Sequence, residues 1–519
     1  MSGFDAPAPL IPEILALHGR WLGSKPALIC DQETQSWGEF DRATNRIANG
    51  LRAGGVGRGD RVVVLMRNSL EMVQVMFGAL KCGAVVVPLN TSIADSAVRA
   101  MIEDCGARVV AASDEHCGRI DALRPFLKSV RVYLGVNAPR IDWLEIGPFR
   151  DQQPDAAPGV EPADDDLCNI IYSSGTTGLP KGIEHTHRRR LDWAYDLAIG
   201  LRYHSGAVTL CALGLYSNIS WVGLLCTFLA GGTVVVARAF DAGAALATIE
   251  RRRITHTSMV PVQFERLLAA PAFARSDVSS LQAVMCCGSP LAAGLKRALI
   301  ERLGCAFIEL YGLTEGVITT LAPEDARAKL DSVGKPLPGT DLRIVGEDDR
   351  ELPRGAVGEI VSRGRILMAG YHHRPDANAD STWIDDQQRR WLRTGDLGRL
   401  DDDGFLYVVD RRKDMIISGG QNVYPADIEA VMITHPAVAE VAVIGMPSAE
   451  WGETPLAVIV PGTGATVTAG ELIAWTNERV GKQQRLGGVE FRESLPRNPN
   501  GKILKRELRH EYQSRVRVP

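Results

Sequence analysis

Residues 60–113 alternate between two kinds of segment, and this alternation restricts the fold more than any other feature of the chain. Short Val-rich runs begin at Asp60, Ala84 and Ala107, and such runs are typical of buried parallel strands. Between them the apolar residues recur at helical spacing, and the segment 69–83 ends in a glycine suited to a helix C-cap. The order strand–helix–strand–helix–strand predicts a parallel sheet covered by helices.

The same pattern returns between 245 and 312, so two such α/β units are expected before residue 340. Short strands with Gly, Pro and Asp turns follow up to Gly404 and predict a smaller β-rich module. The tail then changes to a helix–strand–strand–helix–strand pattern. We therefore expect an α/β fold with a large N-terminal domain at 1–410, a hinge at 411–414 and a small α+β C-terminal domain at 415–519.

Charge and cysteine usage exclude several classes of protein. Lys and Arg total 58 against 62 Asp and Glu, which gives a net charge of −4 and indicates neither a nucleic-acid-binding nor a polybasic membrane protein. The ten cysteines are scattered, and only Cys286 and Cys287 are adjacent. Because no pair has the spacing of a zinc site, reduced thiols in the cytoplasm are expected.

Neither the N-terminus nor the most apolar stretch indicates export or a membrane span. The first residues lack the charged-then-apolar pattern of a signal peptide. The stretch 221–237 contains two threonines and the pair Gly231-Gly232, so a buried helix, a turn and a strand are expected there. A cytoplasmic location is the resulting expectation.

The segment YSSGTTGLPKG, residues 172–182, is the strongest single indicator of function. It follows the apolar run CNII, and six successive residues from Ser173 are Ser, Thr or Gly. Backbone amides and hydroxyls can converge on an anion in such a segment, and Lys181 adds a positive charge. It is not a Walker A loop, because Pro180 stands before the lysine. A flexible surface loop is the alternative.

Five further motifs follow in a fixed order. They are YGLTEG (Tyr311–Gly316), GEIVSRG (Gly358–Gly364), WLRTGD (Trp391–Asp396), DRRKDMIISGGQNVYPADIE (Asp410–Glu429) and LPRNPNGKILKREL (Leu495–Leu508). With the phosphate-binding candidate they span roughly residues 170–510. In this order they resemble the acyl-adenylate-forming enzymes, which include acyl-CoA synthetases, adenylation domains of peptide synthetases and firefly-type luciferases.

The resemblance implies an ATP site with specific roles. Asp396 follows Gly395 in the motif WLRTGD, and a turn is expected there. Asp396 and Arg411 would bind the ribose, Tyr311 and the segment Gly288–Pro290 the adenine, and the loop 173–181 the phosphates. The implied ATP-binding residues are Ser173, Ser174, Gly175, Thr176, Thr177, Lys181, Gly288, Ser289, Pro290, Tyr311, Gly312, Asp396 and Arg411.

Glu315 is the best candidate for a Mg²⁺ ligand. It lies in a Gly turn directly after the strand-like run FIEL, at a position where α/β folds bind ligands. A carboxylate facing a triphosphate is repelled unless a cation lies between them, which favours Mg²⁺ at Glu315. The resemblance places Thr314 near the α-phosphate.

Lys502 is the expected catalytic lysine of adenylation, because the family's lysine lies at this position of the motif. A carboxylate must approach the anionic α-phosphate while charge grows on the leaving pyrophosphate, and a cation that contacts both lowers the barrier by about 3–4 kcal/mol. Thioester formation then requires this lysine to move away. The resemblance implies rotation of a mobile C-terminal domain about Lys413, after which Gly419 and Gly420 would line the path of the thiol.

The thiol is expected to be that of coenzyme A, and a carrier-protein phosphopantetheine is the alternative. The acid pocket should lie among the segments LGLYSNISW, MCCGSPL and YGLTEGV. Its candidate wall residues are Tyr216, Ser217, Asn218, Trp221, Cys287 and Val317. Many members of the family have an aromatic–His pair where this chain has Tyr216-Ser217, so a histidine-gated pocket is not expected. Short, medium, aromatic and long-chain fatty acids all remain open.

The leading interpretation is an acid–thiol ligase that forms acyl-AMP and then acyl-CoA. The alternatives are an enzyme that loads a carrier protein, a luciferase-like oxygenase and a silent binding module. Lys502, Glu315 and Asp396 argue against the last. The sequence does not decide between a monomer and a homodimer.

Overall fold

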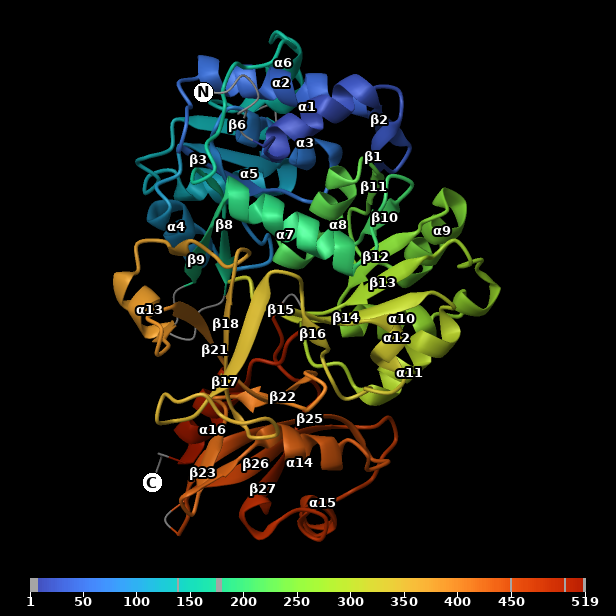
Figure 1. Cartoon of the computed structure of the whole chain (residues 1–519), viewed down its shortest axis with the longest axis vertical. Coiled ribbons are helices and arrows are strands. Elements are labelled where there is room, and N and C mark those ends of the chain that lie inside the picture. The colour runs from blue at the N-terminus through green and yellow to red at the C-terminus, as the bar shows by residue number, and fades with distance from the viewer. Residues whose placement is uncertain (1–7, 138–139, 174–179, 449, 499–500, 517–519) are drawn as a thin grey trace. The chain divides into compact units, whose positions relative to one another are not determined.

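The computed structural model describes residues 8–137, 140–173, 180–448, 450–498 and 501–516 (Figure 1). They form two compact units. The first unit comprises Met1–Leu330, Pro336–Asp341 and Arg363–Thr382, and the second comprises Asp331–Lys335, Leu342–Ser362 and Trp383–Pro519. The C-terminal segment therefore shares a compact unit with most of the β-rich module. The domain division at 410 and the hinge at 411–414 remain predictions.

The first sheet of the first unit confirms the parallel α/β prediction. Its strand order is β19-β9-β8-β4-β3-β5-β6-β7, with parallel pairing from β8 to β7 and antiparallel pairing of β9 and β19 at one edge. Its strands are β3 (Arg61–Leu65), β4 (Val85–Pro88), β5 (Val109–Ser113), β6 (Val132–Val136), β7 (Leu144–Glu145), β8 (Leu167–Ser173), β9 (Lys181–Thr186) and β19 (Gly370–Tyr371).

The second sheet is parallel in its interior and antiparallel at its edges. Its order includes β15-β14-β13-β12-β10-β11-β1-β2, where β15 is antiparallel to β14 and β2 to β1. Its strands are β1 (Pro26–Cys30), β2 (Glu33–Ser36), β10 (Val208–Cys211), β11 (Thr233–Val236), β12 (His256–Met259), β13 (Ala283–Cys286), β14 (Ala306–Gly312), β15 (Ile318–Leu321) and the short β16 (Lys335–Pro336).

Helices cover both sheets. They are α1 (Ile11–Trp21), α2 (Trp37–Ala53), α3 (Leu70–Lys81), α4 (Asp95–Asp104), α5 (Asp114–Leu123), α6 (Ile146–Asp151), α7 (His187–Gly200), α8 (Asn218–Leu229), α9 (Ala242–Arg252), α10 (Pro261–Ala269), α11 (Ala293–Arg302), α12 (Pro323–Ala326) and α13 (Pro375–Asp380). The Ser69 hydroxyl accepts a hydrogen bond from Met72 N at the start of α3, and Gly83 follows its end with φ +80°.

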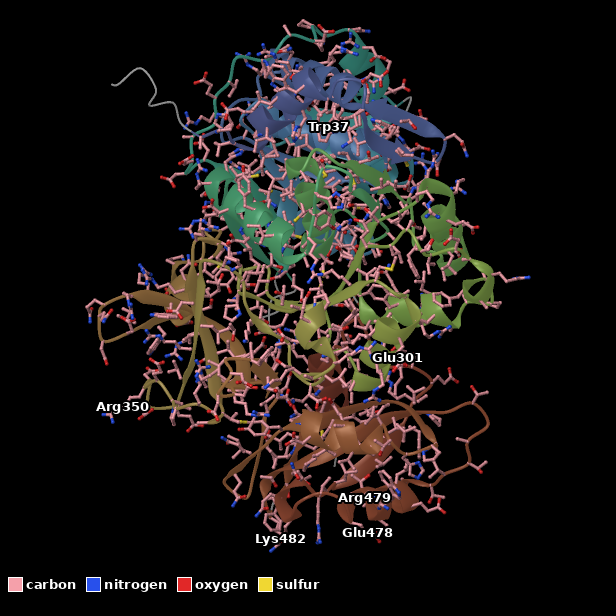
Figure 2. All side chains as sticks on the ribbon, turned by 45° about the vertical axis from the view of Figure 1, so that its right-hand side comes forward. Trp37, Glu301, Arg350, Glu478, Arg479 and Lys482 are labelled. Carbon is pink, nitrogen blue, oxygen red and sulfur yellow. The ribbon has the colours of Figure 1, made fainter. Side chains whose placement is uncertain are left out.

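An aromatic cluster forms part of the core of the first unit. Trp37 (labelled in Figure 2), Phe40, Phe77 and Phe228 are fully or almost fully buried, and neighbouring ring centroids lie 5.1–6.2 Å apart. Edge-to-face contacts of this kind add to the stabilisation from apolar burial. Because these rings come from α2, α3 and α8, they join the N-terminal helices to the helix that precedes β11.

The second unit contains two smaller sheets. The β-rich module has the order β17-β18-β21-β20, with β22 paired to β21, and the C-terminal sheet has the order β24-β23-β26-β25, with β27 paired to β26. The strands are β17 (Thr340–Val345), β18 (Gly358–Gly364), β20 (Thr382–Ile384), β21 (Arg390–Leu400), β22 (Leu406–Arg411), β23 (Ile416–Ser418), β24 (Gln421–Val423), β25 (Val438–Ser448), β26 (Gly452–Pro461) and β27 (Gly488–Phe491). Helices α14 (Pro425–Met432), α15 (Ala469–Asn477) and α16 (Lys505–Val516) complete the unit.

The stretch predicted as helix, turn and strand forms α8, a turn with Gly231 at φ +69°, and β11, as expected. Among the described residues, no helix combines the length and the apolar character needed to cross a membrane. All ten cysteines are unpaired, and nine of them are buried.

Candidate functional site

The two described ends of the predicted phosphate loop lie on adjacent strands. Ser173 ends β8, Lys181 begins β9, and these two residues are register partners in the antiparallel pair. Ser174, Gly175, Thr176 and Thr177 lie outside the described residues. The ladder thus brings the predicted phosphate-binding lysine beside the start of its motif.

Lys181 and Glu315 share one neighbour, Tyr371. The ammonium of Lys181 lies 4.9 Å from the centroid of the Tyr371 ring, and the Tyr371 hydroxyl donates a hydrogen bond of 2.9 Å to Oε1 of Glu315. The structure therefore brings together the predicted phosphate lysine and the predicted metal ligand. Tyr371 was missed by the sequence analysis, since a single tyrosine outside the recognised motifs carries no signal of this contact.

The backbone around Glu315 is fixed by the segment that leads to Tyr371. Met368 N donates to Glu315 O at 2.8 Å. Gly316 has φ +104°, and a Cβ there would lie 2.2 Å from Ile366 O, so a side chain does not fit. The glycine after Glu315 is thus required for this close approach.

The donor set at Glu315 fits Mg²⁺ rather than a metal held entirely by protein. Among the described residues no group of three or more His, Cys, Asp or Glu could hold a metal ion. Mg²⁺ is commonly bound by one or two carboxylates together with substrate phosphates and water. A single half-buried carboxylate at Glu315 matches that requirement.

The two segments predicted to contact adenine lie at one edge of the second sheet. β13 and β14 are parallel neighbours, with Cys286 opposite Glu309. Gly288, Ser289 and Pro290 follow β13, while Tyr311 and Gly312 end β14 and Thr314 follows it. The carboxyl ends of parallel strands are the common ligand-binding edge of α/β folds, which agrees with the predicted role.

A buried ion pair supports these two segments. Lys296 of α11 forms an ion pair with Glu309 of β14, and the two side chains are 2% and 8% exposed. Burial raises the pKa of Glu309, and the charge of Lys296 opposes that rise. The pair thus ties α11, which follows the 288–290 segment, to the strand that ends at Tyr311 and Gly312.

The predicted acid-pocket residues occupy the start of α8 and its surroundings. Ser217 is the N-cap of α8 and accepts a hydrogen bond from Ile219 N. Asn218 is half-buried, and its Oδ1 has no hydrogen-bond partner among the described residues. A Cβ on Gly214 would lie 2.2 Å from the Tyr216 ring, so this glycine permits the ring position.

The remaining wall candidates differ in surroundings. Trp221 is fully buried and donates from Nε1 to Leu215 O, and its ring also packs 5.4 Å from the guanidinium of Arg190, so it contributes to the core. Cys287 and Val317 are buried at the ends of β13 and β15. A Cβ on Gly288 would lie 2.8 Å from Ile219, which places the predicted adenine segment against the start of α8.

In the second unit, Asp396 and Arg411 are cross-strand neighbours. They are register partners of β21 and β22, and Arg411 Nε lies 3.1 Å from Asp396 Oδ1. The expectation of a turn at Asp396 is wrong, because this residue lies within strand β21. The long strand β21 continues through Gly395, which adopts φ +69°, so the carboxylate is held by a strand ladder.

Lys502 lies within electrostatic reach of these two residues. Asn498 Oδ1 accepts a hydrogen bond from Lys502 N at 2.9 Å, and Arg497 and Ile503 form an isolated antiparallel β-bridge. Burial lowers the pKa of Lys502 to about 8, with smaller contributions from Arg411 and Lys413, while Asp396 opposes the shift. The structure therefore brings together the predicted catalytic lysine and the predicted ribose-binding pair.

The predicted hinge residue Lys413 also belongs to this cluster. Burial lowers its pKa, as does the charge of Arg411. Arg509 of α16 donates to Lys413 O at 3.1 Å and lies 4.0 Å from the Asp414 carboxylate. Arg509 was not predicted, because its partner is a backbone carbonyl far away in the chain.

The glycines predicted to line the thiol path form the turn between β23 and β24. Gly419 and Gly420 have φ +58° and +76°. A Cβ on Gly419 would lie 2.9 Å from the Trp451 ring, whereas one on Gly420 would meet no atom within 4 Å. Gly420 thus leaves its backbone open to close approach.

Parallel sheets with polar groups at their carboxyl edge are the features of an α/β nucleotide-binding enzyme. The chain belongs to the AMP-binding enzyme family: residues 19–372 match the AMP-binding enzyme domain, and residues 427–502 match its C-terminal domain. This confirms the resemblance to acyl-adenylate-forming enzymes.

Several known proteins are similar over nearly the whole chain. A feruloyl-CoA synthase of Amycolatopsis sp. is 37% identical, over 92% of this chain and 94% of its own length. A long-chain-fatty-acid–CoA ligase of Mycobacterium tuberculosis is 35% identical, over 93% and 94%. A fatty acid–[acyl-carrier-protein] ligase of Streptomyces coeruleorubidus is 33% identical, over 96% and 95%.

A solved structure gives the same assignment. ATP-bound MatB from Rhodopseudomonas palustris superposes with a TM-score of 0.89 at 29% identity, covering 98% of this chain and all of that chain. The expected fold class is thereby confirmed.

Proposed function

We propose that the protein is an AMP-forming acid–CoA ligase. In the first step a carboxylate attacks the α-phosphorus of ATP, and acyl-AMP and pyrophosphate form. In the second step the thiol of coenzyme A attacks the acyl carbon, and AMP leaves. The observation that carries the proposal is the cluster of Lys502, Asp396 and Arg411 in a member of the AMP-binding enzyme family.

The proposed roles in the first step follow from charge. Lys181 and the loop that begins at Ser173 bind phosphates, and Asp396 with Arg411 binds the ribose. Protonated Lys502 neutralises the carboxylate and the α-phosphate as they approach. Glu315 would hold Mg²⁺, which would neutralise charge on the phosphates when bound.

The proposed second step needs a different position of Lys502. Rotation of residues 415–519 about Lys413 would remove the lysine from the acyl phosphate, and the open backbone at Gly420 would admit the pantetheine arm. The contacts of Arg509 to the 413–414 backbone would change in this rotation.

The acid is proposed to be an aromatic or fatty acid, since relatives named for both are similar over more than nine-tenths of the chain. Ten unpaired cysteines support a reducing compartment, and we propose the cytoplasm. A homodimer stays a prediction.

Loading of a carrier protein is the second candidate. The relative named as a fatty acid–[acyl-carrier-protein] ligase, 33% identical over nearly the whole chain, favours it. Its thiol is the same phosphopantetheine group, so the first step is shared and only the acceptor differs.

A panel of carboxylic acids with AMP release as the readout tests the proposal. Aromatic and fatty acids are incubated with ATP and Mg²⁺, with and without coenzyme A, and the thioester is identified by mass. We expect AMP and acyl-CoA with at least one acid. Adenylation without transfer to coenzyme A, followed by transfer to a phosphopantetheinylated carrier, would favour the second candidate. No AMP or pyrophosphate with any acid would contradict both.

A further inference from the structure

We infer that Tyr371 is a positioning residue that orients the carboxylate of Glu315 toward the metal and holds the ammonium of Lys181 beside it. The inference rests on the proposed function, in which Glu315 binds Mg²⁺ and Lys181 binds phosphate. It adds a residue outside the recognised motifs. Tyr371 acts through these two side chains, and its proposed role includes no contact with the reacting atoms.

The hydroxyl of Tyr371 restricts one oxygen of Glu315. The hydrogen bond to Oε1 is 2.9 Å long and joins a neutral donor to a charged acceptor. Such a bond fixes the rotation of a carboxylate and therefore the direction of its lone pairs. Partners that hold a metal ligand in this way typically change metal affinity or activity 10- to 100-fold when they are removed.

Burial and the neighbouring charge keep Tyr371 a hydrogen-bond donor. Burial raises the pKa of the Tyr371 hydroxyl, and the charge of Glu315 and the hydrogen bond to it raise it further. The Tyr371 hydroxyl is thus favoured as the donor in its contact with Glu315.

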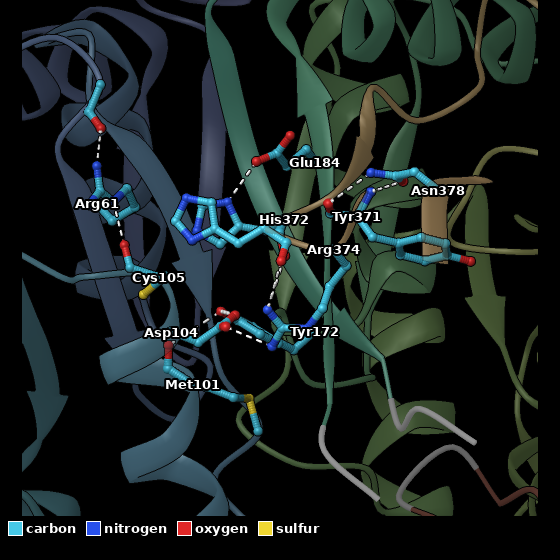
Figure 3. A network of polar contacts seen from close by, with 12 residues as sticks. Arg61, Met101, Asp104, Cys105, Tyr172, Glu184, Tyr371, His372, Arg374 and Asn378 are labelled. Carbon is cyan, nitrogen blue, oxygen red and sulfur yellow. Dashed lines mark hydrogen bonds and ion pairs between the residues drawn. The ribbon is translucent and has the colours of Figure 1, made fainter. Parts of the chain in front are cut away.

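The backbone of Tyr371 is held from two sides. Its amide donates to Oδ1 of Asn378 at 2.8 Å, and its register partner in β9 is Ile183, two residues after Lys181. Figure 3 shows the Asn378 side chain against the Tyr371 backbone. The ring is consequently attached to the same strand ladder that carries Lys181.

The next residues anchor the segment further. His372 Nδ1 lies 2.6 Å from Oε1 of Glu184, and Arg374 donates to Oδ1 of Asp104 at 2.8 Å (Figure 3). Both contacts tie the segment to other elements of the first unit, Glu184 in β9 and Asp104 in α4. Residues 370–374 thus form an anchored segment, and its Tyr371 side chain contacts both Glu315 and Lys181.

The ring face of Tyr371 gives Lys181 a defined position. At 4.9 Å from the centroid, the ammonium is within range of a cation–π contact. Since the ring contacts the cation and the hydroxyl contacts the anion, one rigid side chain sets the relation between the two charges. Nucleotide and metal would then bind to groups that are already arranged.

Two substitutions separate these contacts. Tyr371→Phe removes only the hydroxyl, and Tyr371→Leu also removes the ring. Tyr407→Phe is the matched control, because the Tyr407 hydroxyl also donates to a carboxylate, Asp401 at 3.2 Å, and its ring lies 4.2 Å from the guanidinium of Arg399. Tyr407 therefore reproduces both kinds of contact with residues that have no proposed role in binding nucleotide or metal.

The measurement is equilibrium binding with the full-length protein. Mn²⁺ affinity is measured by electron paramagnetic resonance in the presence of an α,β-methylene ATP analogue, and analogue affinity without metal is measured by calorimetry. Tyr371→Phe should weaken Mn²⁺ binding about 10-fold or more and leave metal-free nucleotide affinity unchanged. Tyr371→Leu should in addition weaken metal-free nucleotide binding about 2- to 5-fold. Tyr407→Phe should change neither.

Wild-type Mn²⁺ affinity in Tyr371→Phe would overturn the inference. Equal losses of Mn²⁺ affinity in Tyr371→Phe and Tyr407→Phe would also overturn it. Unfolding midpoints of the variants, measured alongside, show whether each is folded; Phe retains the ring packing of Tyr371. A failure of the wild-type protein to bind the analogue would instead overturn the proposed function. Binding of the analogue by the wild-type protein is therefore measured first.

Discussion

Two lysines that are shielded from water, one in each unit, have different charged neighbours. Lys296 of the first unit is 2% exposed and forms an ion pair with Glu309. Lys502 of the second unit is half-buried, and burial lowers its pKa to about 8. Arg411 and Lys413 lower this pKa further, whereas Asp396 and Asp414 raise it. The first lysine is in direct contact with its counterion, whereas the second has neighbouring cations that oppose the attraction of nearby carboxylates.

The difference indicates which lysine is available for a ligand. A buried cation with a carboxylate in contact is already neutralised, and a further anion gains little from it. A cation repelled by its neighbours gains strongly when an anion arrives, and shifted pKa values of this kind are common at functional sites. Lys505 strengthens the comparison: three residues after Lys502, it pairs with Glu429 at 2.7 Å, and its pKa is raised.

The largest expected effect is on stability, at the paired lysine. Lys296→Met leaves the Glu309 carboxylate buried without its counterion and should lower the free energy of unfolding by about 3–5 kcal/mol. Urea denaturation followed by tryptophan fluorescence measures this change. Adding Glu309→Leu should restore part of the loss, because no buried charge then remains. An unchanged midpoint in the single variant would refute the structural role of the pair.

The next effect is on catalysis, at the lysine of the second unit. Lys502→Ala should lower the rate of ATP-dependent acyl-CoA formation by about 100- to 1000-fold, as removal of a preorganised charge from an adenylation site does. Lys482→Ala, an exposed lysine on the outer edge of the second unit (Figure 2), is the control and should retain the wild-type rate. Equal activity in the two variants would remove the basis for the comparison.

A smaller effect is expected in the pH dependence. Lys502 must be protonated for adenylation, and its pKa is lowered to about 8 in the protein without nucleotide. The value of kcat/KM for ATP should therefore fall as pH rises through 8, by about tenfold per unit above it. Lys502→Arg should move this break to higher pH, since guanidinium stays charged. A wild-type profile that is flat to pH 10 would contradict the lowered pKa.

The smallest effect tests the repulsion directly. Lys413→Gln removes one of the cations that lower the pKa of Lys502, so the break in kcat/KM should move upward by less than about one pH unit. Rate profiles of the variant and wild type, recorded at the same ionic strength, measure the shift. A downward shift would show that Lys413 does not repel Lys502.

The alternating pattern of the sequence was sufficient to predict β3, α3, β4, α4 and β5 within 60–113, and α9, β12, α10, β13, α11 and β14 within 245–312. In 60–113 each strand is a continuous apolar run and each helix has its own period and glycine end, so local signals coincide with the fold. The strands β1 and β2 were not predicted. Leu28 pairs with Val234, more than 200 residues away, and such long-range pairing leaves no local signal.

The sequence predicted the site residues that lie in motifs, but not the residues that hold them in place. Asp396, Arg411 and Lys502 lie in recognisable segments, and the structure groups them. Tyr371, Glu309 and Arg509 contribute through contacts that cross the chain and have no fixed spacing. Asp396 was expected in a turn because Gly395 precedes it. The same Gly-Asp pair also fits an irregular strand in which the glycine has a positive φ, so the sequence does not separate the two.

The two partial reactions of Lys502→Ala, measured separately, test the central claim most directly. Acyl-AMP formation from acid and ATP should fall at least about 100-fold. Transfer from presynthesised acyl-AMP to coenzyme A should stay within about threefold of the wild-type rate, because Lys502 has no proposed role in that step. Equal losses in both reactions would contradict an adenylation-specific lysine and the rotation proposed to remove it.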